Sequence, residues 1–376
     1  MGSNLRGSIR VTFCPVAPPL VSYLCFHATD MDHTEFAIDP QIITTETNGG
    51  LVLLKAVVGD DPSDCVLTSN AEYLVYDARA AKLDHLPHPG RQHEFDDYTL
   101  AIVRKCKQHC TSSSRDHDCT YVIVAQSLRF GGPQNSHLCM YHSDTQTWSN
   151  KPVVLEPNSY PWNLITSKTL TVGGTVAWVD LWQGILFCDV LDEQPKLRFL
   201  KLPKAIVPRK TARLGDPRSV RDIALVGNPI KFVEMHVHFD RYSKTSRRWK
   251  TTTWSIRTGS FSPEDWTMDH LINSTQLIPA QPSLLHKLKV GTAGIKRAGP
   301  DPTLSTLHVG LPNISLQDDA IVYFLAKIDY RDSRHAAWVL ALDMSNMTVK
   351  EVEPFKAERT LGLARDYDAS RMSAYP

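Results

Sequence analysis

The sequence predicts an all-β fold, an irregular β-propeller-like array of short antiparallel sheets, with a large β-sandwich or barrel as the alternative. Short apolar runs are separated by Gly, Pro, Asn and Asp, a pattern that favours strands joined by turns over helices. Residues 172–191 predict a tight hairpin, with strands at 176–181 and 185–191 that are rich in aliphatic and aromatic side chains. A recurring strand-turn-strand pattern is the third observation, and it favours a repeated sheet.

This recurring pattern occurs five times along the chain. In each case an apolar strand ends near an Asp or a turn pair, and an apolar or aromatic strand follows a few residues later. The strands concerned contain Tyr76, Tyr141, Cys188, Ile256 and Leu342. We interpret the five segments as hairpins of the third and fourth strands of propeller blades. Their spacing is irregular, whereas regular propellers repeat at about 40 to 50 residues, so the sandwich or barrel stays open.

Other elements follow from local patterns. Strands at 99–103 and 120–126 enclose a polar segment, 104–118, which we expect to be an exposed hairpin loop. Two stretches, 219–225 and 263–271, predict weak helices. Strand patterns of one kind resume after every loop, so we expect a single domain over residues 1–376.

Composition narrows the class of protein. The chain has 376 residues, of which 42% are hydrophobic and 22% charged, as in an ordinary soluble globular protein. Its net charge of +1 creates no global field that would attract nucleic acid or an anionic membrane. Several of the eight cysteines lie in apolar runs, which suits a reducing compartment. No signal peptide or membrane-spanning run is recognisable, so we expect a cytoplasmic or nuclear monomer whose partner is another protein.

The sequence lacks the common enzyme motifs. No nucleophile elbow, phosphate-binding loop, dinucleotide-binding turn, His-Glu-x-x-His helix or calcium loop is present. We therefore predict no catalytic residue and no cofactor.

Two groups of residues carry the donor types of a metal site. The first lies in the polar loop and consists of Cys106, His109, Cys110, His117 and Cys119. Thiolate and imidazole suit zinc, but the Cys-x3-Cys-x8-Cys spacing lacks a second close pair, which favours an exposed loop without metal.

The second group lies on a strand. Alternation over residues 232–239 places Glu234, His236 and His238 on one face and apolar residues on the other. These three residues could bind a metal at the axis of a propeller, in a metal-dependent hydrolase. A polar, half-solvated strand face explains the same pattern and is favoured.

Candidate interaction residues combine cations with aromatics. They are Arg241, Tyr242, Arg247, Arg248 and Trp249. Arginine pairs with oxyanions and aromatic rings stack on bases, so such a surface suits an acidic protein partner, with carbohydrate or nucleic acid as alternatives. Trp182, expected at a hairpin turn, either anchors a partner or folds back onto its own sheet.

The run W-V-D-L-W-Q-G-I-L-F-C-D-V-L at residues 178–191 resembles the signature of a plant family called domain of unknown function 1618. Segments at 9–13, 73–78, 138–143 and 230–235 resemble further family segments in the same order, and the resemblance is strongest over 172–254. The family has no established activity. The resemblance thus indicates a family but no function. A rigid β scaffold with polar loops and no motif chemistry favours a non-enzymatic module that binds another protein, with the metal-dependent hydrolase as the alternative.

Overall fold

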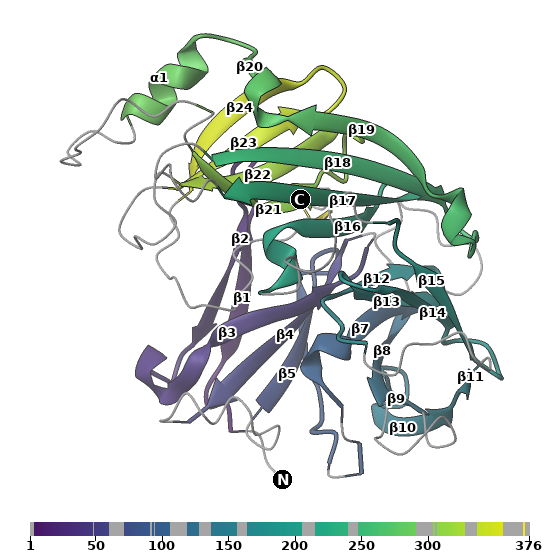
Figure 1. The fold of residues 1–376 in the computed structure, drawn as a ribbon. Coiled ribbons are helices and arrows are strands. Elements are labelled where there is room, and N and C mark those ends of the chain that lie inside the picture. The colour runs from purple at the N-terminus through teal and green to yellow at the C-terminus, as the bar shows by residue number, and fades with distance from the viewer. Residues whose placement is uncertain are drawn as a thin grey trace. The chain divides into compact units, whose positions relative to one another are not determined.

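The structure is a computed structural model, drawn in Figure 1. It describes residues 4–47, 49–59, 71–90, 92–93, 95–105, 119–127, 137–155, 164–204, 215–239, 247–290, 304, 307–327, 337–355 and 371–372.

Nearly all regular structure in the described residues is β-strand, which confirms the all-β class. The strands are β1 (Ile9–Cys14), β2 (Tyr23–Ala28), β3 (Phe36–Thr45), β4 (Leu51–Val58), β5 (Ala71–Asp77), β6 (Lys82–His85), β7 (Ala101–Lys105), β8 (Thr120–Ser127), β9 (His137–His142), β10 (Thr147–Pro152), β11 (Val154–Leu155), β12 (Lys168–Val172), β13 (Thr175–Asp180), β14 (Gly184–Asp189), β15 (Lys196–Lys201), β16 (Arg221–Leu225), β17 (Pro229–Phe239), β18 (Arg247–Arg257), β19 (Thr267–Asn273), β20 (Ile278–Pro279), β21 (His308–Ile314), β22 (Ile321–Lys327), β23 (Ala337–Asp343) and β24 (Thr348–Phe355). The one α-helix among these residues is α1 (Ser283–Val290), and short 3-10 turns are η1 (His33–Glu35), η4 (Asp97–Thr99), η6 (Pro217–Ser219), η7 (Pro263–Asp265) and η8 (Ser274–Gln276).

The strands pair as a propeller-like series of small sheets. Four consecutive strands form an antiparallel meander in each of five sheets: β3–β6, β7–β10, β12–β15, β16–β19 and β21–β24. The short strands β11 and β20 add a parallel edge to the third and fifth of these sheets. Small four-stranded meanders are the blade unit of propellers, so the structure supports the propeller-like prediction over the sandwich or barrel.

Four of the five recurring segments cover the third and fourth strands of a sheet, as predicted: β5–β6, β9–β10, β14–β15 and β23–β24. The remaining one contains the end of the third strand β18, but its fourth strand, β19, begins only at Thr267, within the stretch predicted as a helix. Asp side chains shape several of the turns. Asp77 Oδ1 accepts a bond from the Arg79 amide at 2.9 Å, and Asp343 Oδ1 accepts one from the Ser345 amide at 3.0 Å. A carboxylate that binds the backbone two residues later closes a tight turn, which explains the recurring Asp.

The chain divides into two compact units. Unit 1 comprises Met1–Pro15, Ser22–Leu200 and Ser370–Pro376, and unit 2 comprises Val16–Val21 and Lys201–Ala369. The first three large sheets lie in unit 1, apart from Lys201 at the end of β15, and the last two sheets lie in unit 2.

In unit 1, neighbouring sheets bury their apolar faces against each other. Leu53 and Ile102 belong to a core between the β3–β6 and β7–β10 sheets. Val124 and Trp178 belong to another, between the β7–β10 and β12–β15 sheets. Trp178 also donates its indole hydrogen to the Thr99 carbonyl at 2.6 Å, so the one polar atom of this buried ring is satisfied.

The small β1–β2 hairpin in unit 1 is amphipathic. Val11, Phe13, Leu24 and Phe26 pack against the core of the β3–β6 sheet that contains Leu54. Residues that alternate with these point the other way and are more exposed. The hairpin thus covers one sheet with its apolar face and offers a polar face to solvent.

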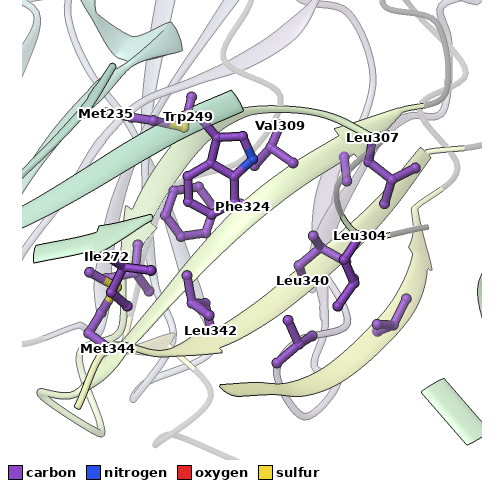
Figure 2. Close-up of a cluster of buried hydrophobic side chains, with 14 of the residues drawn as sticks. Met235, Trp249, Ile272, Leu304, Leu307, Val309, Phe324, Leu340, Leu342 and Met344 are labelled. Atoms are coloured by element: carbon purple, nitrogen blue, oxygen red, sulfur yellow. The ribbon is translucent and has the colours of Figure 1, made fainter. Parts of the chain in front are cut away.

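Unit 2 has one large core between the β16–β19 and β21–β24 sheets. Figure 2 shows Met235, Trp249 and Ile272 from the first sheet gathered with Phe324 and Leu342 from the second. Helix α1 contributes two buried side chains, Leu284 and Leu288, to the same core.

Both predicted helices are wrong. Residues 219–225 form the end of η6 followed by β16, and residues 263–271 form η7 followed by most of β19. Each stretch begins with a helix-start signal, Asp216-Pro217 or Ser262-Pro263, but the helical turn lasts three residues and the chain then joins a sheet. Backbone pairing with a neighbouring strand overrides weak helix propensity. The strands predicted around the polar loop are confirmed as β7 and β8, and the loop itself lies outside the described residues.

Candidate interaction surface

The candidate surface lies on the β17–β18 ribbon of unit 2. These two strands pair over eleven residues each, with His236 opposite Lys250 and Val237 opposite Trp249. Directly opposed residues in an antiparallel pair share one face of the sheet. The register therefore divides the cationic and aromatic cluster predicted from sequence between the two faces.

Trp249 lies on the inner face and is 2% exposed. Its ring centroid is 5.6 Å from that of Phe324, and Met235 and Ile272 lie in the same core (Figure 2). The expectation that Trp249 offers its ring to a ligand is wrong, because strand alternation turns it away from the neighbouring cations and into the core. This burial leaves Tyr242, which lies outside the described residues, as the remaining aromatic of the cluster for a carbohydrate or nucleic-acid site.

The outer face carries the cations. Arg248 and Lys250 are exposed there, and His236, opposite Lys250, is partly buried. On the other side of β18, Leu271 of β19 lies opposite Thr252 and is 51% exposed, so its side chain shares the face with the two cations. A bulge between Thr253 and Trp254 shifts the register, and the exposed Met268 lies opposite Trp254. Two cations of β18 and two large apolar side chains of β19 thus share one face of the sheet.

Sequence reasoning missed the contribution of β19. Residues 263–271 carry apolar side chains at spacings that fit a helix, and this concealed the strand that brings Leu271 beside Lys250. The η7 turn at Pro263–Asp265 ends at Trp266, whose buried ring packs edge-on against Phe232 at 6.2 Å. No signal in the sequence gives the bulge that sets the position of Met268.

The metal or hydrolase interpretation of the strand is not supported. Glu234 lies opposite Arg221 of β16 and forms an ion pair with it, with both side chains largely buried. The Arg221 guanidinium also lies 5.7 Å from the Phe232 ring centroid, which holds the pair in place. The Glu234 carboxylate is thus already paired with Arg221 inside the sheet. The side chain of His238 lies outside the described part of the structure.

Most of the remaining candidates cannot be placed. Cys106, His109, Cys110 and His117 lie outside the described residues, as do Arg241 and Tyr242, and Arg247 is described only as the first backbone position of β18. Cys119 is described and partly buried. Among the described residues, no group of three or more His, Cys, Asp or Glu side chains could hold a metal ion.

Trp182 lies in the β13–β14 turn of unit 1 and is partly buried. Asp180 shapes this turn: its Oδ1 accepts bonds from the amides of Trp182 and Gln183, at 2.8 and 3.1 Å. Position 184 is a glycine because there is no room for a side chain there. A Cβ there would lie 2.4 Å from the Phe199 ring and 2.5 Å from the Leu200 carbonyl oxygen. Turn geometry therefore explains Asp180 and Gly184 in the run at 178–191.

Comparisons with known proteins give a match to one family model and no function. The sequence model of a family described as Protein of unknown function (DUF1618) matches residues 178–323. No curated protein matches the chain. A chain in a crystal structure of a mitotic checkpoint complex is similar at 8% identity, with 95% of this chain and 92% of that chain covered and a TM-score of 0.33. The β-propeller domain of Myceliophteria thermophila Cps50 (Swd1) is similar at 8% identity, with 86% and 88% covered and a TM-score of 0.30. Likeness at this level supports no conclusion about binding or assembly.

The search for a membrane-spanning segment gave a negative result. No helix in the described residues has the length and apolar character needed to cross a bilayer.

Proposed function

We propose that the chain is a plant member of the DUF1618 family and acts as a non-enzymatic interaction module in the cytoplasm or nucleus. It binds, as a monomer, an acidic and partly apolar segment of another protein. The family match over residues 178–323 supports the membership. The observation that carries the function is the outer face of β18, where Arg248 and Lys250 are exposed beside Leu271.

The chemistry of this face suits a protein segment. Arg248 and Lys250 attract and orient carboxylates, and arginine can hold a carboxylate through two parallel hydrogen bonds. Leu271 and Met268, both about half exposed, supply the apolar area that an anchor residue of a partner would cover. Exposed charge pairs alone contribute little binding energy, so an apolar contact beside them is needed for a stable complex.

The test is affinity purification of the tagged protein from its native tissue, followed by mass spectrometry. The variant Arg248→Ser, Lys250→Ser, Leu271→Ser removes both cations and one apolar contact. A matched control, Lys196→Ser with Lys201→Ser, removes two exposed cations from β15. We expect reproducible partners that are lost in the first variant, retained in the control, and weakened by salt. Partners that persist in the first variant would contradict the proposal, and so would the absence of any reproducible partner.

We also propose that residues 1–376 form one domain. Blade-type third and fourth strands recur in both compact units, which supports a single repeated architecture. A single calorimetric transition with equal calorimetric and van't Hoff enthalpies is the expected result. Two separate transitions would assign the units to independent domains.

A further inference from the structure

Two cysteines face each other on the solvent side of the β1–β2 hairpin. In the strand register Cys14 is opposite Tyr23 and Cys25 is opposite Thr12, so the cysteines occupy diagonal positions on one face. Their sulfur atoms are 3.9 Å apart. This face is the polar one, because the alternating residues of the hairpin pack into the core of unit 1.

The pair is accessible, unlike the two cysteines in the cores. Cys25 is exposed and Cys14 partly buried. Cys139 and Cys188 are buried, and burial raises the pKa of each of these thiols to about 12, which keeps them protonated and inert. Accessibility and proximity to a second thiol coincide at Cys14 and Cys25.

The surroundings give the two sulfurs different roles. A hydrogen bond with Cys14 is the main cause that raises the pKa of the Cys25 thiol, so Cys25 retains its proton. The charge of Cys14 and a hydrogen bond with it also raise the pKa of the Tyr23 hydroxyl. Cys14 lies opposite Tyr23 in the strand register, so its sulfur has both the Cys25 thiol and Tyr23 as neighbours on this face.

We propose that Cys14 and Cys25 form an oxidant-responsive dithiol that a hydroperoxide converts to a disulfide. The Cys14 sulfur attacks the O–O bond of the hydroperoxide; the S–O bond forms, the O–O bond breaks, and the alcohol, or water in the case of hydrogen peroxide, leaves. Cys14 is now a sulfenic acid. The Cys25 sulfur attacks the Cys14 sulfur, the S–S bond forms, and the sulfenic oxygen leaves with two protons as water. The two thiols together lose two electrons, which the peroxide bond accepts.

Closure requires only local movement. The sulfurs must approach from 3.9 Å to about 2.05 Å, a change that rotation of both side chains and a small shift of the paired strands supply. The disulfide would join the ends of a hairpin whose intervening segment is residues 15–24. Its consequence is to hold the two strands of the hairpin together and to restrict the unfolded chain.

The experiment treats the reduced full-length chain with hydrogen peroxide, alkylates the remaining thiols and digests with trypsin. Residues 11–55 form one tryptic peptide that contains Cys14 and Cys25 and no other cysteine. We expect this peptide unalkylated and lighter by two hydrogens, and alkylated at both positions if dithiothreitol precedes alkylation. Chymotryptic cleavage after Tyr23 then yields two peptides joined by the disulfide. Alkylation of Cys14 and Cys25 as complete after peroxide as before it would overturn the proposal, as would linkage of either residue to another cysteine.

Two variants test the order of the steps and the role of Tyr23. In Cys25→Ser, dimedone should trap the sulfenic acid at Cys14, whereas in Cys14→Ser the label on Cys25 should fall to the level found without peroxide. Tyr23→Phe should slow dimedone labelling of Cys14 in the Cys25→Ser background several-fold without changing the thermal midpoint. Equal labelling of the two single-cysteine variants would overturn the assignment of Cys14 as the attacking sulfur. An unchanged rate in Tyr23→Phe would remove Tyr23 as a positioning residue.

Discussion

At the beginning of strand β18 the two faces differ in exposure and in chemistry, although they come from one run of sequence. Arg248 and Lys250 are exposed, while Trp249 and Thr251, their immediate neighbours, are buried among the apolar residues of unit 2. Successive side chains of a strand point to opposite faces, so a cluster along the chain is not a cluster in space. The comparison teaches that the composition of a short segment identifies a surface only after its register is known.

The largest effect should come from Trp249. Trp249→Ala removes a buried ring that packs on Phe324 and Met235, and we expect the free energy of unfolding to fall by about 3 to 5 kcal/mol. Denaturant unfolding measures this change. Trp249→Phe serves as the conservative control and should lose less, because it keeps an aromatic side chain near Phe324. A loss below about 1 kcal/mol for Trp249→Ala would contradict the burial that separates the faces.

A buried carboxylate in the facing sheet tests what burial requires of a charged group. Asp343, 4% exposed, ends β23 beside the core residue Leu342. Burial alone would raise the pKa of Asp343, but bonds from Ser345 and Asn346, together with Lys350, outweigh it and hold the pKa well below the usual 3.8. Because the folded pKa is depressed, the carboxylate stabilises the fold fully above about pH 5, and this stabilisation is lost as pH falls below about 4.

We therefore expect Asp343→Asn to lower the free energy of unfolding at pH 7 by about 2 kcal/mol. The difference from the wild-type protein should shrink as the pH is lowered from about 5 toward 2, as measured by denaturant unfolding at each pH. Asp192→Asn, at an exposed turn position, is the matched control and should have no comparable effect. A difference that stays constant over this pH range would rule out the charged Asp343 as the stabilising form.

Much of the architecture follows from the sequence, but the candidate surface does not. Four of the five third-and-fourth-strand hairpins could be predicted because Asp-centred turns and apolar runs are local signals. The alternation that buries Val233 and Met235 is also local, and it is confirmed. The position of Leu271 beside Lys250 depends on pairing between strands, on a bulge, and on a helix signal at Pro263 that extends for one turn. Such pairings are tertiary, and no pattern within either segment specifies them.

A substitution at Thr251, also on the inner face, should change the free energy of unfolding by less, and the change should be an increase. Its side chain is fully buried and its Oγ1 has no hydrogen-bond partner. Replacement of an unpaired buried hydroxyl by a methyl group removes a desolvation cost, so we expect Thr251→Val to raise the free energy of unfolding by about 1 kcal/mol. Thr44 in unit 1 is the matched control, because its hydroxyl is 3.0 Å from the Thr169 hydroxyl. Thr44→Val should destabilise by about 1 kcal/mol. If both variants are destabilised, the Thr251 hydroxyl has a partner.

The smallest change in stability should come from the outer face. Arg248→Ala with Lys250→Ala removes two exposed cations, and surface substitutions of this kind change the free energy of unfolding by less than about 0.5 kcal/mol. If the face binds an acidic segment, the same variant should weaken that complex at low salt, and the difference from the wild-type protein should narrow at high salt because the lost interactions are screened. Binding at a series of salt concentrations, together with denaturant unfolding, separates the two effects. A large loss of stability would mean that these cations support the fold, and any loss of binding could then no longer be attributed to a recognition surface.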